Sequence, residues 1–271
     1  MKKTGKKFLA AALAAAMLAS MAGCGNSAQE AATETTTAEA AASAEATEAT
    51  TAAEETTAEE TQAEAEVPAE QMQADIVVIG AGGAGMTAAI QAVQDGATDV
   101  IILEKMPVTG GNTTRSTGGL NAAGTKYQAA EGIEDSVELF VEDTMKGGKE
   151  LNDKELVTVM AENSSAAVDW VNEIGGDLSV VGMFGGASVK RIHRPSDTSA
   201  VGPMLVKALN AKLDELKVPV LLETKATKIL ANDKGAVCGV VAEDKDGKEM
   251  TISCTAVILA TGGFGANSEM V

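Results

Sequence analysis

Three glycines at fixed spacing could carry chemistry in this chain. Gly80, Gly82 and Gly85 form a G-x-G-x-x-G pattern directly after the apolar run IVVI. In such a pattern the first glycine makes a tight turn, the second lets the backbone approach a pyrophosphate, and the third lets a helix pack on the strand. Amide groups at the start of that helix then bind the phosphates. The predicted dinucleotide-binding residues are Gly80, Gly82, Gly83, Ala84 and Gly85.

An acid stands where a dinucleotide-binding unit needs one. Val100 to Leu103 read as a second buried strand, and Glu104 follows it. This places the acid about 20 residues beyond Gly85, where a carboxylate accepts hydrogen bonds from a ribose. The pattern predicts two parallel strands joined by a helix. A purely structural glycine turn, which is the alternative, would explain neither the acid nor the helix.

The stretch after Glu104 distinguishes a flavin from a nicotinamide cofactor. A nicotinamide domain would continue into another crossover helix, but here the loop EKMPVTGGNTTRSTGGLNAAGT carries two Gly-Gly pairs. Such a loop can place backbone amides along a second, bulkier part of the cofactor. The alternative is a plain surface loop. The candidate cofactor-binding residues of this stretch are Glu104, Lys105, Gly111, Asn112, Thr113, Thr117, Gly118 and Gly119.

Together these stretches resemble the flavoprotein family of soluble fumarate reductases, which includes flavocytochrome c and urocanate reductase. Succinate dehydrogenase flavoprotein subunits and aspartate oxidase are more distant relatives. The resemblance implies an α/β fold, a Rossmann-like FAD-binding domain with a parallel sheet plus a β-meander. The residues that carry it are GAGGAG at 80–85, LEK at 103–105, GGNT at 110–113, STGGLNAAGT at 116–125, HRP at 193–195 and VILATGGF at 257–264.

The resemblance also implies how the cofactor is held. FAD would bind non-covalently, because the second glycine loop lacks the His to which the respiratory relatives attach it. Ala226 would meet the adenine through its backbone. Ala260, Thr261 and Gly262 would close over the cofactor.

The implied activity is that of an FAD-dependent oxidoreductase acting on CH–CH bonds. In the family, hydride passes from flavin N5 to the β-carbon of a small unsaturated carboxylic acid, such as fumarate or urocanate, and a cationic acid protonates the neighbouring carbon. The substrate-clamping Arg and His residues lie in later segments, so no catalytic residue is assigned here. The chain as given is expected to be incomplete and inactive alone. A non-catalytic FAD-binding remnant is the alternative.

The rest of the chain divides into four segments. We expect a lipoprotein signal peptide at 1–23, a disordered tether at 24–73, an incomplete FAD-binding domain at 74–264 and the start of a missing capping domain at 265–271. Helices are predicted at 135–146, 153–174 and 200–216, with Asp135 and Asp153 as caps. Short strands follow between 220 and 261. In the second helix the predicted buried face is Leu156, Val159, Met160, Ala167, Val168 and Val171.

The N-terminus predicts export and lipidation. Two lysine pairs precede an apolar run, as in a secretory signal, and Met-Ala-Gly-Cys resembles a bacterial lipobox with lipid on Cys24. An ordinary signal peptide with a chance cysteine is the alternative. Residues 25–73 contain twelve Glu and no Lys or Arg, so they cannot bury a core. We expect an exported protein, lipid-anchored to the outer face of the bacterial cytoplasmic membrane.

Composition and motifs limit the partners and cofactors that this chain could bind. The net charge of −18 argues against nucleic-acid binding, and no metal-ligand spacing occurs. No C-x-x-C-H haem motif occurs either. The electron donor is therefore expected to be a separate FMN, haem or quinol-linked protein, or to lie in the missing part. A solute-binding lipoprotein fits the anchor but not the glycines.

The single histidine, its two neighbouring arginines and the two cysteines of the predicted domain have less specific expected roles. His193 is expected to be structural, with a supporting contact near the flavin as the alternative. Arg191 and Arg194 are candidates to face an anionic cofactor or substrate. Cys238 and Cys254 lie on neighbouring predicted strands, opposite one another if the turn between them has three residues. We expect free, buried thiols.

Overall fold

The computed structural model describes residues 70–265 and 267–271, all within one compact unit. The predicted signal peptide, Cys24 and the predicted tether up to residue 69 lie outside the described residues. The helices are α1 (Gly83–Gln94), α2 (Lys126–Ala130), α3 (Val137–Gly147), α4 (Lys154–Glu173) and α5 (Val201–Leu216), with a 3₁₀ helix η1 at Gly111–Arg115.

A four-stranded parallel sheet forms the centre of the domain, in the order β11-β2-β3-β7. Its inner strands are continuous apolar runs, as strands covered on both faces should be. The helix α1 connects β2 to β3, so the glycine turn lies at the carboxyl end of β2. The strands are β2 (Ile76–Ile79), β3 (Val100–Leu103), β7 (Val220–Leu221) and β11 (Ala256–Leu259).

A second sheet contains the predicted meander, in the order β1-β10-β9-β8. The strands β8, β9 and β10 are antiparallel, and β1 adds to β10 in parallel. The bounds are β1 (Glu70–Gln73), β8 (Lys225–Ala231), β9 (Val237–Glu243) and β10 (Glu249–Ser253). A third sheet, β4-β6-β5, joins Leu120–Asn121, Ile192–Arg194 and Val180–Gly182.

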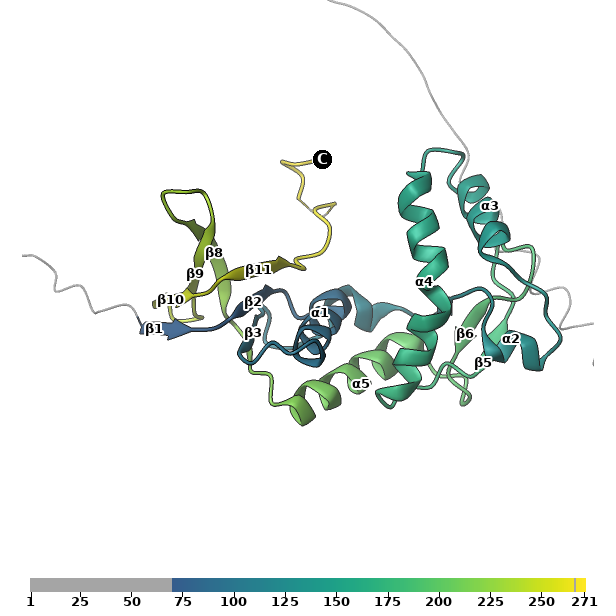
Figure 1. Cartoon of the computed structure of the whole chain (residues 1–271), viewed down its shortest axis with the longest axis horizontal. Coiled ribbons are helices and arrows are strands. Elements are labelled where there is room, and N and C mark those ends of the chain that lie inside the picture. Colours follow the sequence, from purple (N-terminus) through teal and green to yellow (C-terminus); the bar gives the residue numbers. More distant parts are fainter. Residues whose placement is uncertain (1–69, 266) are drawn as a thin grey trace, which may run out of the picture. The chain divides into compact units, whose positions relative to one another are not determined.

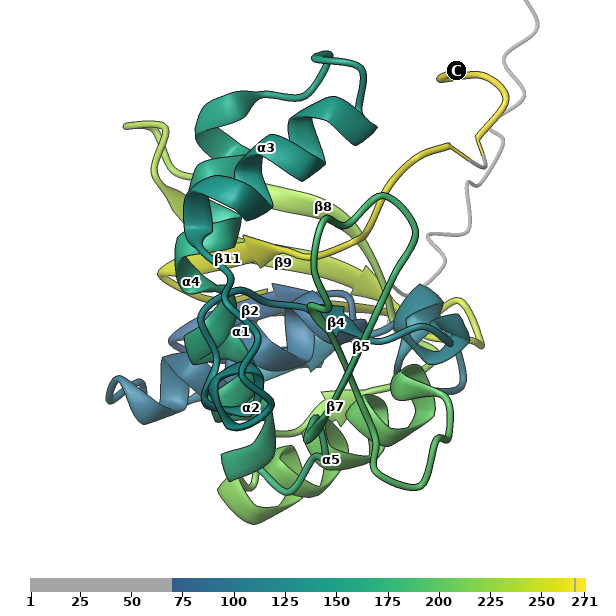
Figure 2. The same cartoon turned by 90° about the vertical axis from the view of Figure 1, so that its right-hand side faces the viewer.

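Two apolar cores hold these layers together. On one face of the central sheet, Val77 and Ile101 pack against meander residues such as Val240 and Ile252. On the other face, β-strand residues pack against α1 and α5, for example through Met86 and Leu209. Figure 2 shows the β2 strand between the meander strands β8 and β9 and the helix α5. The α/β fold with a parallel sheet and a β-meander is therefore confirmed.

The helices α3 and α4 pack against each other (Figure 1), but not through the predicted face of α4. Leu156, Val159 and Met160 are exposed. The buried positions are Val157, Ala161, Ser164, Val168 and Val171. The prediction was right for Val168 and Val171 but wrong for Ala167, which is exposed. It was also wrong for the first half of α4, because smaller residues one position along the helix make the close contact with α3.

Two further predictions need correction. Glu70–Gln73 was assigned to the tether but pairs with β10 through its backbone, which a polar sequence can do at a sheet edge. The cap of α3 is Ser136, whose hydroxyl accepts from the Leu139 amide, and not Asp135. Asp153 does cap α4.

Cys238 and Cys254 are both free, but of these two only Cys254 is buried. The β9–β10 turn has the three-residue form, since the Asp244 amide donates to the Lys248 carbonyl. Cys254 therefore lies opposite Cys238, and its amide donates to the Cys238 carbonyl over 3.3 Å. Cys238 is exposed and is the extra, unpaired residue of the bulge near the end of the β8–β9 ladder. The prediction of two buried thiols was wrong for Cys238.

No helix among residues 70–265 and 267–271 is long and apolar enough to cross a membrane. The same described residues hold no group of three or more His, Cys, Asp or Glu side chains arranged for a metal ion.

Candidate functional site: a dinucleotide cradle

The first glycine turn connects β2 to α1 without room for side chains at two of its positions. Gly80 has a φ of +108°, and a Cβ there would collide with the Ala260 carbonyl oxygen. A Cβ on Gly85 would collide with the Gly80 carbonyl oxygen. Both glycines are therefore needed for the turn and for close packing of the helix on the strand.

Gly82 differs from these two glycines. A Cβ on Gly82 would meet only the Gly110 carbonyl oxygen, at 4.0 Å. Its backbone, with φ −76° and ψ −178°, is open to any residue. Nothing in the fold requires glycine here, so the missing side chain leaves space for a ligand at the N-terminus of α1.

The second glycine loop lies directly beside the first. The Gly110 amide donates to the Ala81 carbonyl over 2.8 Å, and the Gly83 amide donates to Thr113 Oγ1 over 3.1 Å. A Cβ on Gly111 would lie 3.8 Å from Gly82 Cα. The structure thus brings together the predicted residues of the two loops, with Ala84 and Asn112 exposed next to them. Ala81 and Gly110, which join the loops, were missed; the Gly-Gly pair was the available signal.

Glu104 is bound in the same cradle. Its side chain is buried; Oε2 accepts from the Ala81 amide over 2.8 Å, and Oε1 accepts from the Met106 amide over 2.9 Å. A carboxylate has about four lone-pair positions, so capacity remains for the hydroxyls of a ribose. This geometry fits the role predicted from its position after β3.

Replacing Glu104 with glutamine should weaken FAD binding. Glutamine has one acceptor oxygen, so one of the two backbone amides would face an NH₂ donor. Loss of a charge-assisted hydrogen bond costs about 1.5–3 kcal/mol, or roughly a tenfold to hundredfold rise in Kd. Titration of the apoprotein with FAD would measure the change in Kd. Glu249→Gln is the control, because Glu249 is an exposed carboxylate on β10. An unchanged Kd would contradict the role.

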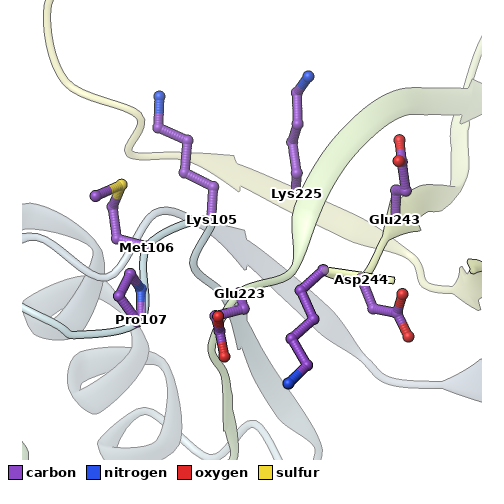
Figure 3. Close-up of a pocket in the computed structure, with 8 residues that line it drawn as sticks. Lys105, Met106, Pro107, Glu223, Lys225, Glu243 and Asp244 are labelled. Carbon is purple, nitrogen blue, oxygen red and sulfur yellow. The ribbon is translucent and has the colours of Figure 1, made fainter. Parts of the chain in front are cut away.

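A pocket of about 530 Å³ opens beside Glu104, between the end of β3 and the start of β8. The Thr224 amide donates to the Glu104 carbonyl over 2.9 Å, which holds these two segments together. Figure 3 shows Lys105 and Lys225 on the two sides of the pocket, extending in the same direction. Ala226, the predicted adenine contact, follows Lys225 and is half-buried. The predicted adenosine residues Glu104, Lys105 and Ala226 therefore converge on one region.

The second Gly-Gly pair is fixed by the third sheet. Gly119 has a φ of +148°, and a Cβ there would collide with the His193 carbonyl oxygen. A Cβ on Gly118 would lie 3.4 Å from Ile192 Cδ1. Thr117, just before this pair, is exposed. The loop thus runs from the phosphate end of the cradle, at Thr113, to the strands β4 and β6.

The C-terminal return reaches the first glycine turn through Ala260 and Thr261. The Ala260 amide donates to the Ile79 carbonyl over 2.9 Å, and its Cβ would lie 3.2 Å from a Cβ built on Gly85. Thr261 and Gly262 follow as exposed residues. Of the three residues predicted to close over the cofactor, the structure therefore places Ala260 and the backbone of Thr261 against the first glycine turn, since Thr261 Cα would lie 3.4 Å from a Cβ built on Gly80.

His193 is a buried structural residue in this domain. Its Nδ1–H donates to the Arg191 carbonyl over 2.9 Å, and its Nε2 lies 2.8 Å from Thr125 Oγ1. Burial lowers the pKa of His193 from its ordinary value of 6.5, although nearby backbone and acidic groups act in the opposite direction. The ring is neutral and connects β6 to the start of α2, which agrees with the structural assignment.

The lowered pKa of His193 predicts how stability depends on pH. Between the folded and unfolded pKa values, the unfolded chain binds more protons, so stability rises with pH and is lost as pH falls below about 6.5. Urea unfolding at about pH 5.5 and 7.5 should show a smaller difference in the His193→Gln variant than in the parent. An equal difference in both proteins would show that His193 does not contribute.

Arg191 does not face a ligand, which corrects one of the two arginine candidates. Its Nε and Nη2 donate to Asp135 over 3.0 and 2.7 Å, and its Nη1 donates to Asp143 over 2.7 Å. Its guanidinium carbon lies 4.7 Å from the centre of the Phe140 ring. Burial would lower the pKa of Arg191, but the two carboxylates raise it overall. Arg191 therefore connects the start of β6 to α3 through buried ion pairs.

Comparison with known proteins identifies the cradle. Residues 75–271 match the protein family described as FAD binding domain. The chain belongs to this family. FAD is therefore the cofactor of the described domain. The residues fit it: Gly82 leaves open space at a helix N-terminus, Glu104 retains acceptor capacity, and a pocket adjoins the adenosine residues.

Individual relatives agree with the family. The chain is 46% identical over 197 residues to the "Fumarate reductase (cytochrome)" of Shewanella frigidimarina, covering 73% of this chain and 34% of that protein. It is 38% identical over 200 residues to the urocanate reductase of Eggerthella lenta, covering 72% and 32%. The open conformation of a flavocytochrome c3 fumarate reductase superposes with a TM-score of 0.70 at 41% identity, covering 73% and 35%. The chain spans about a third of each relative.

Proposed function

We propose that this chain supplies the FAD-binding part of a flavin-dependent reductase of unsaturated carboxylic acids, with fumarate-like or urocanate-like substrates. The observation that carries the proposal is the 46% identity to a protein named fumarate reductase, over a region that contains both glycine loops. The name of the urocanate reductase relative supports the wider substrate class. The chemistry shared by these names is reduction of a carbon–carbon double bond next to a carboxylate.

Residues of this chain would bind and orient the cofactor for that reaction. The amides at the start of α1 and the space at Gly82 would hold the pyrophosphate, and Glu104 would hold a ribose. Gly118 and Gly119 would lie along the flavin ring. When bound, FAD supplies the hydride transfer. The protein's contribution is position, exclusion of water and electrostatics.

A reduced-dye assay on the FAD-loaded full chain tests the proposal. Oxidation of reduced methyl viologen on addition of fumarate or urocanate, absent with the saturated acid, would support it. The Gly82→Val variant, expected to lack FAD, is the matched control. If the chain binds FAD but no unsaturated acid oxidises the dye, the chain is inactive alone, as the sequence predicts. A chain that takes up no FAD would refute the proposal.

Export and lipid anchoring are part of the same proposal. The lysine pairs, the apolar run and Cys24 support it. A separate FMN, haem or quinol-linked protein would then deliver electrons at the outer face of the cytoplasmic membrane. Labelling with radioactive palmitate tests the anchor: label on the parent and none on Cys24→Ala would support it. Unlabelled parent protein, or equal label on both, would refute it.

A further inference from the structure

One face of the β4-β6-β5 sheet has an unusual composition. In this ladder Asn121 pairs with Ile192, and Arg194 pairs with Val180. Because directly opposite residues share a face and alternate residues along a strand do too, Asn121, Ile192 and Arg194 lie on one face. The other positions of that face are Gly119, Gly182 and Val180, so two of its positions carry no side chain. His193 and Leu120 lie on the opposite face.

Arg194 is held on this face without a partner. A Cβ on Gly119 would lie 3.0 Å from Arg194 Cγ, and a Cβ on Gly182 would lie 3.8 Å from Arg194 Cδ, so the arginine stem lies across the two glycines. Its Nε is fully buried and has no hydrogen-bond partner. Among the described residues, no carboxylate makes an ion pair with it. The neighbouring Arg191, in contrast, has two carboxylates.

Asn121 adds a second unpartnered group on the same face. Its Oδ1 is buried and accepts no hydrogen bond. Asn121 and Arg194 are diagonal neighbours across adjacent strands, which brings their side chains within reach of one another or of a common ligand. A buried polar atom without a partner is unfavourable, so a ligand that satisfies both groups would stabilise this face.

We infer that Arg194 and Asn121 form an anion-binding site at the flavin end of the cradle, an inference that rests on the proposed function. Its position follows from Gly119, which the arginine stem crosses. The ligand chemistry is a planar, delocalised anion that accepts from a guanidinium. A ligand that also carries an N–H, as the flavin pyrimidine ring does, would in addition satisfy Asn121 Oδ1. Two sources fit: the carboxylate of the acid substrate and the negatively charged pyrimidine ring of the reduced flavin.

The experiment compares Arg194→Gln with the parent full chain loaded with FAD. Calorimetric titration with malonate, a dicarboxylate without a double bond, measures the carboxylate source. The midpoint potential of bound FAD measures the flavin source, because a lost cation disfavours the anionic reduced form. Lys190→Gln is the matched control, since it removes an exposed charge four residues away that pairs with Glu131. Thermal melts verify that each variant folds.

Each outcome decides the inference. A malonate Kd raised roughly tenfold or more, with an unchanged potential, assigns the site to the substrate carboxylate. A lowered potential with an unchanged malonate Kd assigns it to the reduced flavin. If both values equal those of the parent, the inference is overturned. A colourless parent would refute the proposed function separately, and malonate titration of the colourless chain would still decide whether the anion site exists.

A second variant tests the site without replacing Arg194 itself. Asn121→Asp places a carboxylate next to Arg194 on the same face, so an internal ion pair should exclude an external anion and weaken malonate binding or lower the potential as Arg194→Gln does. Asn152→Asp is its control, because the Oδ1 of Asn152 is also buried without a partner but lies between α3 and α4. Equal effects of the two aspartates would overturn the inference.

Discussion

Replacing Arg191 with methionine is expected to lower the free energy of unfolding by roughly 3–5 kcal/mol, because it leaves a buried carboxylate without its counter-charge. Asp135 is fully buried at the side-chain level in this ion pair, and Asp143 is nearly so. Burial raises the pKa of Asp143, but the hydrogen bonds from Ser188 and Arg191 and the charge of Arg191 outweigh burial, so the pKa lies below its ordinary value. Both acids therefore depend on the network that Arg191 completes.

Urea unfolding of Arg191→Met and Lys190→Met would measure this effect. Lys190 makes an exposed ion pair with Glu131 at 3.3 Å, and exposed pairs contribute only about 0–1 kcal/mol. The large loss should therefore occur in the arginine variant alone. Equal, small losses in both variants would show that the buried network does not hold β6 against α3.

Replacing Gly82 with valine is expected to abolish FAD binding while leaving the apoprotein folded. The backbone at Gly82 suits any residue, and its surroundings have space for a Cβ, so the cost falls on the ligand. Overlap of a side chain with the pyrophosphate costs about 3 kcal/mol or more, which corresponds to at least roughly a hundredfold in Kd.

Gly85→Val is the matched comparison for Gly82→Val. A Cβ at Gly85 collides with the Gly80 carbonyl oxygen within the protein itself, so this variant should lose stability before any cofactor is added. Thermal melts of the apoproteins, followed by FAD titration, separate the two effects. If Gly82→Val binds FAD like the parent, the open space at Gly82 is not the pyrophosphate site.

The glycine turns and the acid could be predicted from sequence because each follows from a local backbone requirement. Gly80 and Gly85 have no room for a side chain, and Glu104 follows a strand at a fixed distance from the turn. Such constraints act within a short stretch of chain, so the order of residue types alone expresses them. The apolar runs of β2 and β3 predict the parallel sheet for the same reason.

What could not be predicted depends on pairing between distant segments. The face that carries Asn121 and Arg194 exists only because β4 pairs with β6. The helices α2, α3 and α4 lie between these two strands in the sequence. Arg191 and Arg194 look equivalent in sequence, and only the positions of Asp135 and Asp143 separate them. In α4, hydrophobicity favoured the larger side chains Leu156 and Met160, whereas close approach of α3 selects smaller ones.

The cofactor content of the purified full chain tests the central claim most directly. The protein should bind FAD in equimolar amount, and denaturation without proteolysis should release all of it as FAD, since the second glycine loop holds no His for covalent attachment. A colourless protein that takes up no added FAD, or one that releases only FMN, would contradict the account.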